Sequence, residues 1–459
     1  MKAELAFMVF LCMGAALASV PVAGNIKLSQ DDSQMRIVTV DYSLSQTAIV
    51  TVDFQTNVLE DASGDWVSIG EANFRSVSGD VNKIVEKTEA DGRRTITWNA
   101  CAEWPNVRIG KPRFRAKLTA WPTNSPPDYM VIDLRPADSY PARYYVCEEA
   151  LPYGPVTNKI YKDELLVLKR IRAKGVVWLR GAGEQMKNWF WDPFGSNWET
   201  YSRRYRQHPV MLTRDYYIGV YEITEGQYYR VRGGTSAPTL PRFPQRANYA
   251  STGSWVAGFR GGSGEGWPAF KASGEFDYDK SHAVNADSFF GRLRARAEVK
   301  GVYDMPTDAQ WEYACRAGTD EPVPVRLEKT TSTDIYSNMC RYYSNQQTAD
   351  CEGLTGYTMA TVGSYEPNPW GLYDMLGNCY EFVLDHYGSG DNQLFSAYDP
   401  DKVLVDPYGS PDSKSNFCVR GGHASQTSGY CNAVFCGEQS SALGAPGVSW
   451  GTRVVMDIN

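Results

Sequence analysis

The feature that most constrains this fold is a change of pattern near residue 121. Before it, apolar and polar residues alternate with a period of two, which is the spacing of a strand with one buried face. Several such strands separated by turns predict a small all-β sandwich over residues 19–121. Fold-level analogy gives such a domain an adhesive or spacing role. The alternating apolar sets are Val38, Val40, Tyr42 and Leu44, then Val50, Val52 and Phe54, then Phe114, Ala116, Leu118 and Ala120.

Residues 1–18 have the pattern of a secretory signal peptide. Lys2 precedes an apolar stretch, and Ala16-Leu17-Ala18 has the small residues of a cleavage site. No later segment has the roughly 18 continuous apolar residues that a membrane span needs. The sequence therefore predicts a secreted or periplasmic protein without a membrane span. Its formal net charge of -7 argues against nucleic acid as a partner, and its oligomeric state stays open.

The rest of the chain predicts a linker and a second domain. Residues 122–164 are rich in Pro and Tyr, which indicates an extended linker. Because 459 residues exceed the size of one ordinary core, we expect a second domain over 165–459. Two helices are predicted in it, and the second would bury Trp311 and Cys315. Their capping pairs are Thr224 with Gln227 and Thr307 with Gln310, and they stop at Gly233 and Gly318.

Five stretches of this second domain resemble the formylglycine-generating enzyme (sulfatase-modifying factor) family, in the same order and spacing. They are YYIGVYEITEGQYYRV, MPTDAQWEYACRAGT, NPWGLYDMLGNCYEFVLDHYG, CVRGGHAS and WGTRVV. The resemblance implies an α+β fold of the C-type-lectin-like kind. The founding activity of the family is copper- and oxygen-dependent oxidation of a sulfatase cysteine to formylglycine.

The resemblance also implies a calcium site in residues 374–381. Asp374 and Glu381 would supply carboxylate oxygens, and Gly377 and Cys379 would supply backbone carbonyls. Such oxygen ligands suit Ca²⁺, a hard cation, so we expect Ca²⁺ as a cofactor. The alternative is that the two acidic residues cap local turns. A second family site would involve Asn345 and an acidic residue near Asp350 or Glu352.

Nine cysteines remain once the leader, with Cys12, is removed. In an oxidising compartment most should pair, and an odd number leaves one over. The family has a bridge between the second helix and a late strand, which implies a Cys315–Cys436 disulfide. Cys431 is expected to be the odd thiol. The other expected pairs are Cys340–Cys351, Cys379–Cys418 and Cys101–Cys147, the last joining the linker to the sandwich.

The copper chemistry of the family depends on two cysteines, five residues apart, that follow its RGGS motif. Cys431 occupies the second position, but Gln426 occupies the first, and His423 replaces the motif serine. A glutamine carbonyl is a hard, neutral oxygen, whereas Cu(I) prefers sulfur. We therefore expect neither copper nor the standard oxidase reaction.

Two functions remain. One is a binding module whose groove, lined by Ser425, Gln426 and Tyr430, takes a peptide, a glycan or another exported protein. The other is a metal-dependent oxidase, either with Cys431 and His423 as a mixed thiolate–imidazole copper site or with a non-haem iron or copper centre. The remaining histidines are His208, His282 and His386, and no HxH or HxxxH spacing occurs. His386 beside Asp385 is the best isolated pair, and a surface turn explains it as well.

Overall fold

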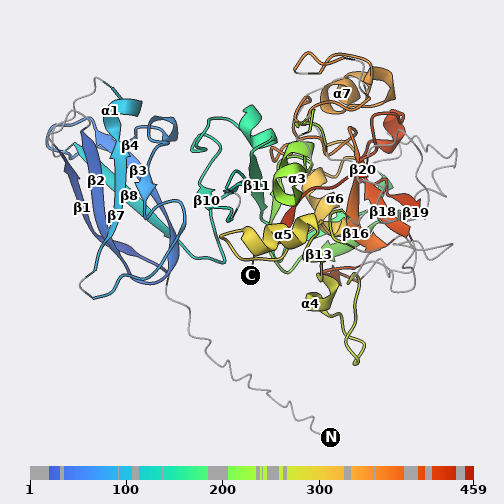
Figure 1. Ribbon diagram of the computed structural model, residues 1–459, viewed down its shortest axis with the longest axis horizontal. Helices are drawn as coiled ribbons and strands as arrows, with labels where there is room; N and C mark the ends of the chain where they lie inside the picture. Colours follow the sequence, from blue (N-terminus) through green and yellow to red (C-terminus); the bar gives the residue numbers. More distant parts are fainter. Residues whose placement is uncertain are drawn as a thin grey trace, which may run out of the picture. The chain divides into compact units, whose positions relative to one another are not determined.

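The computed structural model divides the chain into two compact units (Figure 1). One comprises residues up to Ile69 with Val77–Thr123, and the other Gly70–Ser76 with Asn124–Asn459. The predicted signal peptide lies outside the described residues. These are 20–31, 36–90, 92–105, 113–136, 138–184, 205–233, 238–239, 241–244, 258–261, 266–324, 332–350, 352–355, 358–386, 402–408, 416–440 and 450–458.

The first unit is a sandwich of two antiparallel sheets, as the alternation predicts. One sheet has the order β1-β2-β7-β5 and the other β4-β3-β6, with β8 also paired to β3. In the core the rings of Phe54 and Trp98 stack with 4.7 Å between their centroids. The strands are β1 Ala23–Gln30, β2 Ile37–Leu44, β3 Ala48–Asn57, β4 Trp66–Ser68, β5 Ser78–Gly79, β6 Ile84–Val85, β7 Arg94–Asn99 and β8 Phe114–Trp121, with a short helix α1 at Ala100–Glu103.

The segment predicted as a linker is instead built into the second unit. Its strands β9 (Tyr129–Asp133) and β10 (Ala142–Tyr145) form one edge of a six-stranded sheet, β10-β9-β11-β14-β21-β15. The prediction of an extended connector over 122–164 is wrong because its tyrosines and branched apolar residues form strands and become buried in this sheet. The other members are β11 Leu165–Ile171, β14 Tyr216–Gly219, β15 Tyr303–Asp304 and β21 Val455–Asp457.

Two smaller sheets complete the second unit. One has the order β12-β13-β17 (Val177–Arg180, His208–Met211 and Leu404–Val405). The other has the order β19-β18-β16-β20 (Gly437–Ser440, Asn416–Arg420, Tyr380–His386 and Trp450–Gly451). In the second of these, Arg420 of β18 lies opposite Glu381 of β16. This pairing places the predicted calcium segment beside the loop that leads to Cys431.

Both predicted helices are confirmed. α3 (Glu225–Arg232) and α6 (Asp308–Arg316) each begin with a complete capping box, and Trp311 and Cys315 are fully buried. The additional helices are α4 Tyr278–Ser281, α5 Phe289–Arg296 and α7 Ser332–Met339, with 3-10 turns η1 Glu71–Asn73, η2 Lys159–Lys162, η4 Tyr343–Asn345 and η6 Ser428–Tyr430. Within the described part of the chain, none of the helices has the length and apolar character needed to cross a bilayer.

Candidate functional site

The loop that carries the predicted site residues begins with two glycines in the left-handed region. Gly421 and Gly422 have φ values of 84° and 76°, which residues with a side chain rarely adopt. A Cβ on Gly421 would lie 3.1 Å from the Met375 carbonyl oxygen, and one on Gly422 would lie 2.9 Å from Cys431 Sγ. The glycine pair therefore lets the loop fold back closely over Cys431.

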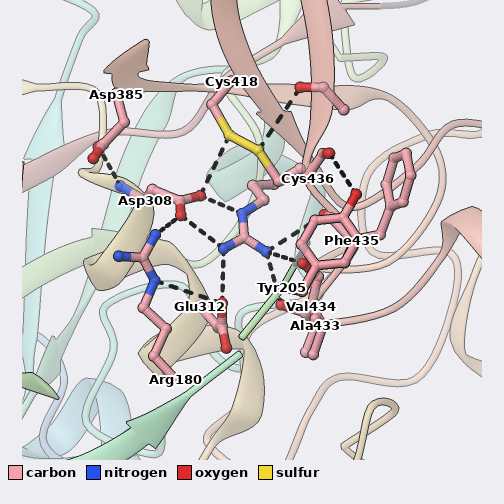
Figure 2. The surroundings of a disulfide bond; sticks show 12 residues. Arg180, Tyr205, Asp308, Glu312, Asp385, Cys418, Ala433, Val434, Phe435 and Cys436 are labelled. Carbon is pink, nitrogen blue, oxygen red and sulfur yellow. Dashed lines mark hydrogen bonds and ion pairs between the residues drawn. A yellow bond between two sulfur atoms is a disulfide. The ribbon is translucent and has the colours of Figure 1, made fainter. Parts of the chain in front are cut away.

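Arg420, the residue before these glycines, anchors the loop to helix α6. Its Nη2 donates to Asp308 Oδ2 at 2.9 Å and to Glu312 Oε2 at 2.7 Å. Its Nη1 donates to the carbonyls of Ala433 and Val434, at 3.0 and 2.9 Å. Figure 2 shows these acceptors around one guanidinium group, beside the Cys418–Cys436 disulfide. Because the group joins the helix to the chain just after Cys431, it fixes both ends of the loop.

The Glu312 carboxylate of this network is held ionised by arginines. Burial alone would raise the pKa of Glu312, but the guanidinium groups of Arg316, Arg420 and Arg180 hold it at about 2. Arg180 also pairs with both Glu312 and Asp308, and Arg316 pairs with Glu312 at 2.8 Å. Such a buried, fully paired network is costly to break because removal of one partner leaves an uncompensated charge.

The Asp385–His386 pair belongs to the core. Both residues lie in the fully buried strand β16, so the surface-turn interpretation is wrong. Asp385 Oδ2 accepts from the backbone N–H of Asp308 at 2.7 Å, at the start of α6, and burial raises the pKa of Asp385 to about 6. The His386 ring packs on Phe417 with 4.7 Å between centroids. Of the other histidines, His282 Nδ1 contacts Asp304 at 2.8 Å and His208 Nδ1 contacts the Arg206 carbonyl at 2.8 Å.

The residues predicted to line a groove are the accessible part of the loop. Ser425 and Thr427 are exposed, and Gln426 and Tyr430 are half-buried. The Gln426 side chain hydrogen-bonds Tyr380, but its Oε1 is buried without a partner in the described part of the structure. An unpaired buried carbonyl oxygen is costly, so Gln426 has an unused acceptor at the position where the resemblance expects a thiol.

His423 and Cys431 are both buried, and the contacts described for them are made with different residues. His423 Nδ1 accepts from the backbone N–H of Ser425 at 3.1 Å, and the ring packs on Tyr380 with 4.9 Å between centroids. Burial lowers the pKa of His423 to about 4, so the imidazole is neutral. The thiol that contacts Cys431 is instead that of Cys340, through a side-chain hydrogen bond.

Two of the predicted disulfides are contradicted by the structure. Cys436 is bonded to Cys418, with 6.1 Å between Cα atoms, because the two residues lie at the neighbouring strands β18 and β19. Both the Cys315–Cys436 and the Cys379–Cys418 pairing are therefore wrong. Cys101 and Cys147 lie in different units, and Cys351 lies outside the described residues, so the Cys101–Cys147 and Cys340–Cys351 pairings stay predictions.

The predicted calcium segment contains a buried cluster of carboxylates. Asp374 Oδ2 accepts from the Gly363 N–H at 2.5 Å, whereas Oδ1 is buried and has no partner among the described residues. Burial raises the pKa of Asp374 to about 6. Glu381 is engaged by Arg453 at 2.5 Å and by Trp311 Nε1 at 3.0 Å. The free oxygen of Asp374 fits a cation, while the Glu381 carboxylate is already used.

Sequence reasoning missed a third carboxylate, Glu222. It accepts from the Cys379 N–H at 3.2 Å and from Asn378 Nδ2 at 3.1 Å. Burial, with Asp374 and Glu381 nearby, raises its pKa well above the ordinary range. Glu222 lies in the apolar run VYEIT, directly after β14 and before the Thr224 cap. An acidic residue inside such a buried run is the signal that could have identified it.

The residues named for a second calcium site are all engaged by protein groups. Asn345 Oδ1 accepts from the Tyr342 N–H at 2.8 Å. Asp350 accepts three backbone N–H groups, those of Glu352, Leu354 and Thr361. Glu352 pairs with Arg242. The arrangement stabilises a loop, and it gives a second cation no vacant carboxylate among these groups.

Comparison with known proteins shows which family this part of the chain resembles. Residues 169–458 match the sulfatase-modifying factor enzyme 1-like domain. The formylglycine-generating enzyme of Thermomonospora curvata is 29% identical over 130 residues, which is 28% of this chain and 40% of that protein. Serine/threonine-protein kinase pkn1 of Chlamydia pneumoniae is 34% identical over 97 residues, 21% of this chain and 13% of the kinase. The matches thus span less than half the length of these relatives.

Solved structures also align with the chain. Treponema denticola variable protein 1 aligns with 20% identity and a TM-score of 0.40, over 64% of this chain and 95% of that one. PvdO from Pseudomonas aeruginosa aligns with 17% identity and a TM-score of 0.40, over 64% and 94%.

Proposed function

This chain belongs to the sulfatase-modifying factor enzyme family, with its C-type-lectin-like fold, and from that premise we propose that its second unit is a binding module. The module takes a peptide, a protein or a glycan and does not catalyse the copper-dependent oxidation on which the family was founded. We further propose that the protein is exported, through the leader at residues 1–18, and that the sandwich domain presents the module.

Gln426 carries this proposal. It stands where the family has the first of two thiols, and an amide oxygen is a poor ligand for Cu(I). His423 does not compensate, because its Nδ1 already accepts from Ser425. Among the described residues the Oε1 of Gln426 has no partner, so this half-buried side chain keeps an acceptor for a donor group, such as a peptide N–H or a sugar hydroxyl.

The surroundings of Gln426 support recognition. Ser425 and Thr427 add hydroxyl groups at the exposed part of the loop, and Tyr430 adds an aromatic ring. The backbone beneath them is held, since the Tyr343 N–H donates to the Gln426 carbonyl at 2.8 Å. A rigid loop with polar and aromatic side chains binds with little loss of conformational entropy.

Calcium is proposed as a structural cofactor. Asp374 Oδ1, which has no partner in the described part of the chain, would be one ligand, and the carbonyls of Gly377 and Cys379 together with Glu222 would complete an oxygen set. When bound, the ion would neutralise the like charges of Asp374 and Glu222, whose pKa values are both raised. Asn378, between the two carbonyl positions, donates to Glu222 at 3.1 Å and so orients it. The role would be to fix the backbone that supports the loop.

The proposal is tested by fluorescence anisotropy with a labelled sulfatase-motif peptide and by a glycan array. Wild type, Gln426→Ala and Ser425→Ala are compared with Glu275→Gln, a control at an exposed side chain of the same unit. Loss of one or two hydrogen bonds should weaken binding roughly tenfold in the loop variants, and the control should bind as wild type does. Equal affinity of all four proteins, or no binding to any probe, would contradict the proposal.

A second candidate, a metal-dependent oxidase, is favoured by one observation. Cys431 does have a thiol neighbour, but it is Cys340 and not His423. Titration with Cu(I) against a competing chelator separates the candidates. An oxidase requires tight binding that is lost in Cys340→Ser and in Cys431→Ser but kept in His423→Ala, whereas a binding module requires no tight copper site.

A further inference from the structure

Cys340 and Cys431 come from distant parts of the sequence, yet backbone contacts hold their segments together. Residue 341, next to Cys340, bridges to Gly377, and the Asn378 N–H donates to the Arg341 carbonyl at 2.9 Å. The Gly377 N–H in turn donates to the Gly421 carbonyl at 2.7 Å. The segment at residues 377–378 therefore lies between Arg341, which follows Cys340, and Gly421, which precedes the glycine packed against Cys431.

Two glycines allow the thiols to approach each other. A Cβ on Gly377 would lie 2.9 Å from Cys340 Cβ, and a Cβ on Gly422 would lie 2.9 Å from Cys431 Sγ. Both glycines have positive φ, 74° and 76°. Each cysteine is thus packed against a position where any larger residue would push it out of place.

The two thiols are in contact and shielded from solvent. Both cysteines are fully buried, with 0% exposure, and their side chains are hydrogen-bonded to each other. The Cys340 thiol also donates to the Tyr336 carbonyl at 3.3 Å. Disulfide formation is limited chiefly by backbone geometry, and here hydrogen bonds between their segments hold the backbones of the two cysteines near each other.

We propose that Cys340 and Cys431 are a redox-modification site that closes to a disulfide in an oxidising environment. One thiol loses its proton and attacks a small-molecule disulfide such as oxidised glutathione, which releases one reduced thiol. The second cysteine then displaces the other half, so that two Sγ–H bonds are replaced by one Sγ–Sγ bond and the donor is reduced to two thiols. Because both sulfurs are buried, the exchange occurs during folding or after local opening of the loop.

The disulfide would join the loop that carries Gln426 covalently to the segment that begins at Cys340. The Tyr343 N–H already donates to the Gln426 carbonyl at 2.8 Å, so the bond would add a second tie to the same loop. It would also consume the thiols that a soft metal needs. The inference goes beyond the proposed binding function and does not depend on it.

Peptide mapping tests this directly. The purified full-length protein is incubated with oxidised glutathione or with dithiothreitol, alkylated in denaturant, digested and analysed by mass spectrometry. The expected result is a Cys340–Cys431 cross-linked peptide after oxidation, which separates into two alkylated peptides after reduction. A Cys340–Cys351 cross-link, or alkylated Cys340 and Cys431 after oxidation and after oxidative refolding, would overturn the proposal.

A thermal measurement supplies the second readout. Closure of a loop of about 90 residues should raise the Tm of the oxidised protein by about 5 °C over the reduced one. Cys340→Ser and Cys431→Ser should each lose this increment, and Cys101→Ser, at an exposed free thiol, should keep it. Any difference in Tm between oxidised and reduced protein that remains in both serine variants is due to the Cys418–Cys436 disulfide. If all four proteins show the same increment, the bond has no part in stability and the proposal fails. Should a serine variant not fold, the wild-type peptide map still decides.

Discussion

Arg420 Nη2 donates to Glu312 Oε2 at 2.7 Å, with both side chains buried. The contact joins the arginine of the RGG motif to helix α6, far away in the sequence. The same guanidinium group holds the carbonyls that follow Cys431. The arginine of this motif therefore has a structural role that does not require a copper site.

Replacement of Arg420 should destabilise the second unit strongly. Arg420→Met leaves Asp308 and Glu312 short of a buried cation, and breaking such a pair costs about 3–5 kcal/mol. Urea unfolding monitored by tryptophan fluorescence measures this loss. The matched control is Arg135→Ala, whose pair with Asp133 has side chains 40% and 24% exposed and should cost no more than about 1 kcal/mol. Similar losses in both variants would contradict the assignment.

Acid should weaken the fold through Glu312. Its pKa in the folded protein is about 2, against an ordinary value of 4.5, so the folded state holds this proton less tightly than the unfolded state. The stabilisation is complete above pH 4.5 and is lost as the pH falls toward 2. From pH 5 to pH 3, the unfolding free energy of wild type should decrease by about 2 kcal/mol more than that of Glu312→Gln. Parallel pH profiles would show that Glu312 does not carry the effect.

The local features of this fold were predictable from sequence. The capping boxes at Thr224 and Thr307 depend on residues three positions apart, and the strand alternation of β2 is equally local. The place of Gln426, five residues before Cys431 in the loop after the RGG motif, could be read from the spacing of the motif alone. Each of these depends on neighbours that the sequence itself places together.

The predictions that failed concern features that depend on contacts between segments far apart in the sequence. The choice of Cys418 over Cys315 as partner of Cys436 is made by the pairing of β18 with β19. Cys340 and Cys431 are brought together by backbone bonds from residues 377–378 to Arg341 and to Gly421, and by the bond from Tyr343 to Gln426. Pro and Tyr content indicated a linker, but β9 becomes buried through its pairing with β10 and β11. These strand and cysteine pairings cannot be predicted from composition alone.

Calcium should stabilise the protein through Asp374. If the ion binds the unpartnered Oδ1, addition of millimolar Ca²⁺ to chelator-treated protein at pH 7.5 should raise the Tm by several degrees, as expected for a ligand at many times its Kd. Asp374→Asn removes a ligand charge and should abolish the increase. The control Asp350→Asn alters a carboxylate that already accepts three backbone N–H groups, and it should keep the calcium response. An unchanged Tm in wild type would exclude the site.

We propose that Gln426, in place of the first family cysteine, removes the copper chemistry of the family while the fold is kept. The most direct test incubates the protein with copper, oxygen and a sulfatase-motif peptide, and follows conversion of the peptide cysteine to formylglycine by mass spectrometry. Wild type should leave the peptide unchanged, and Gln426→Cys, which restores the thiol position, is the matched variant. Formylglycine produced by wild type, and lost in Cys431→Ser, would contradict the account.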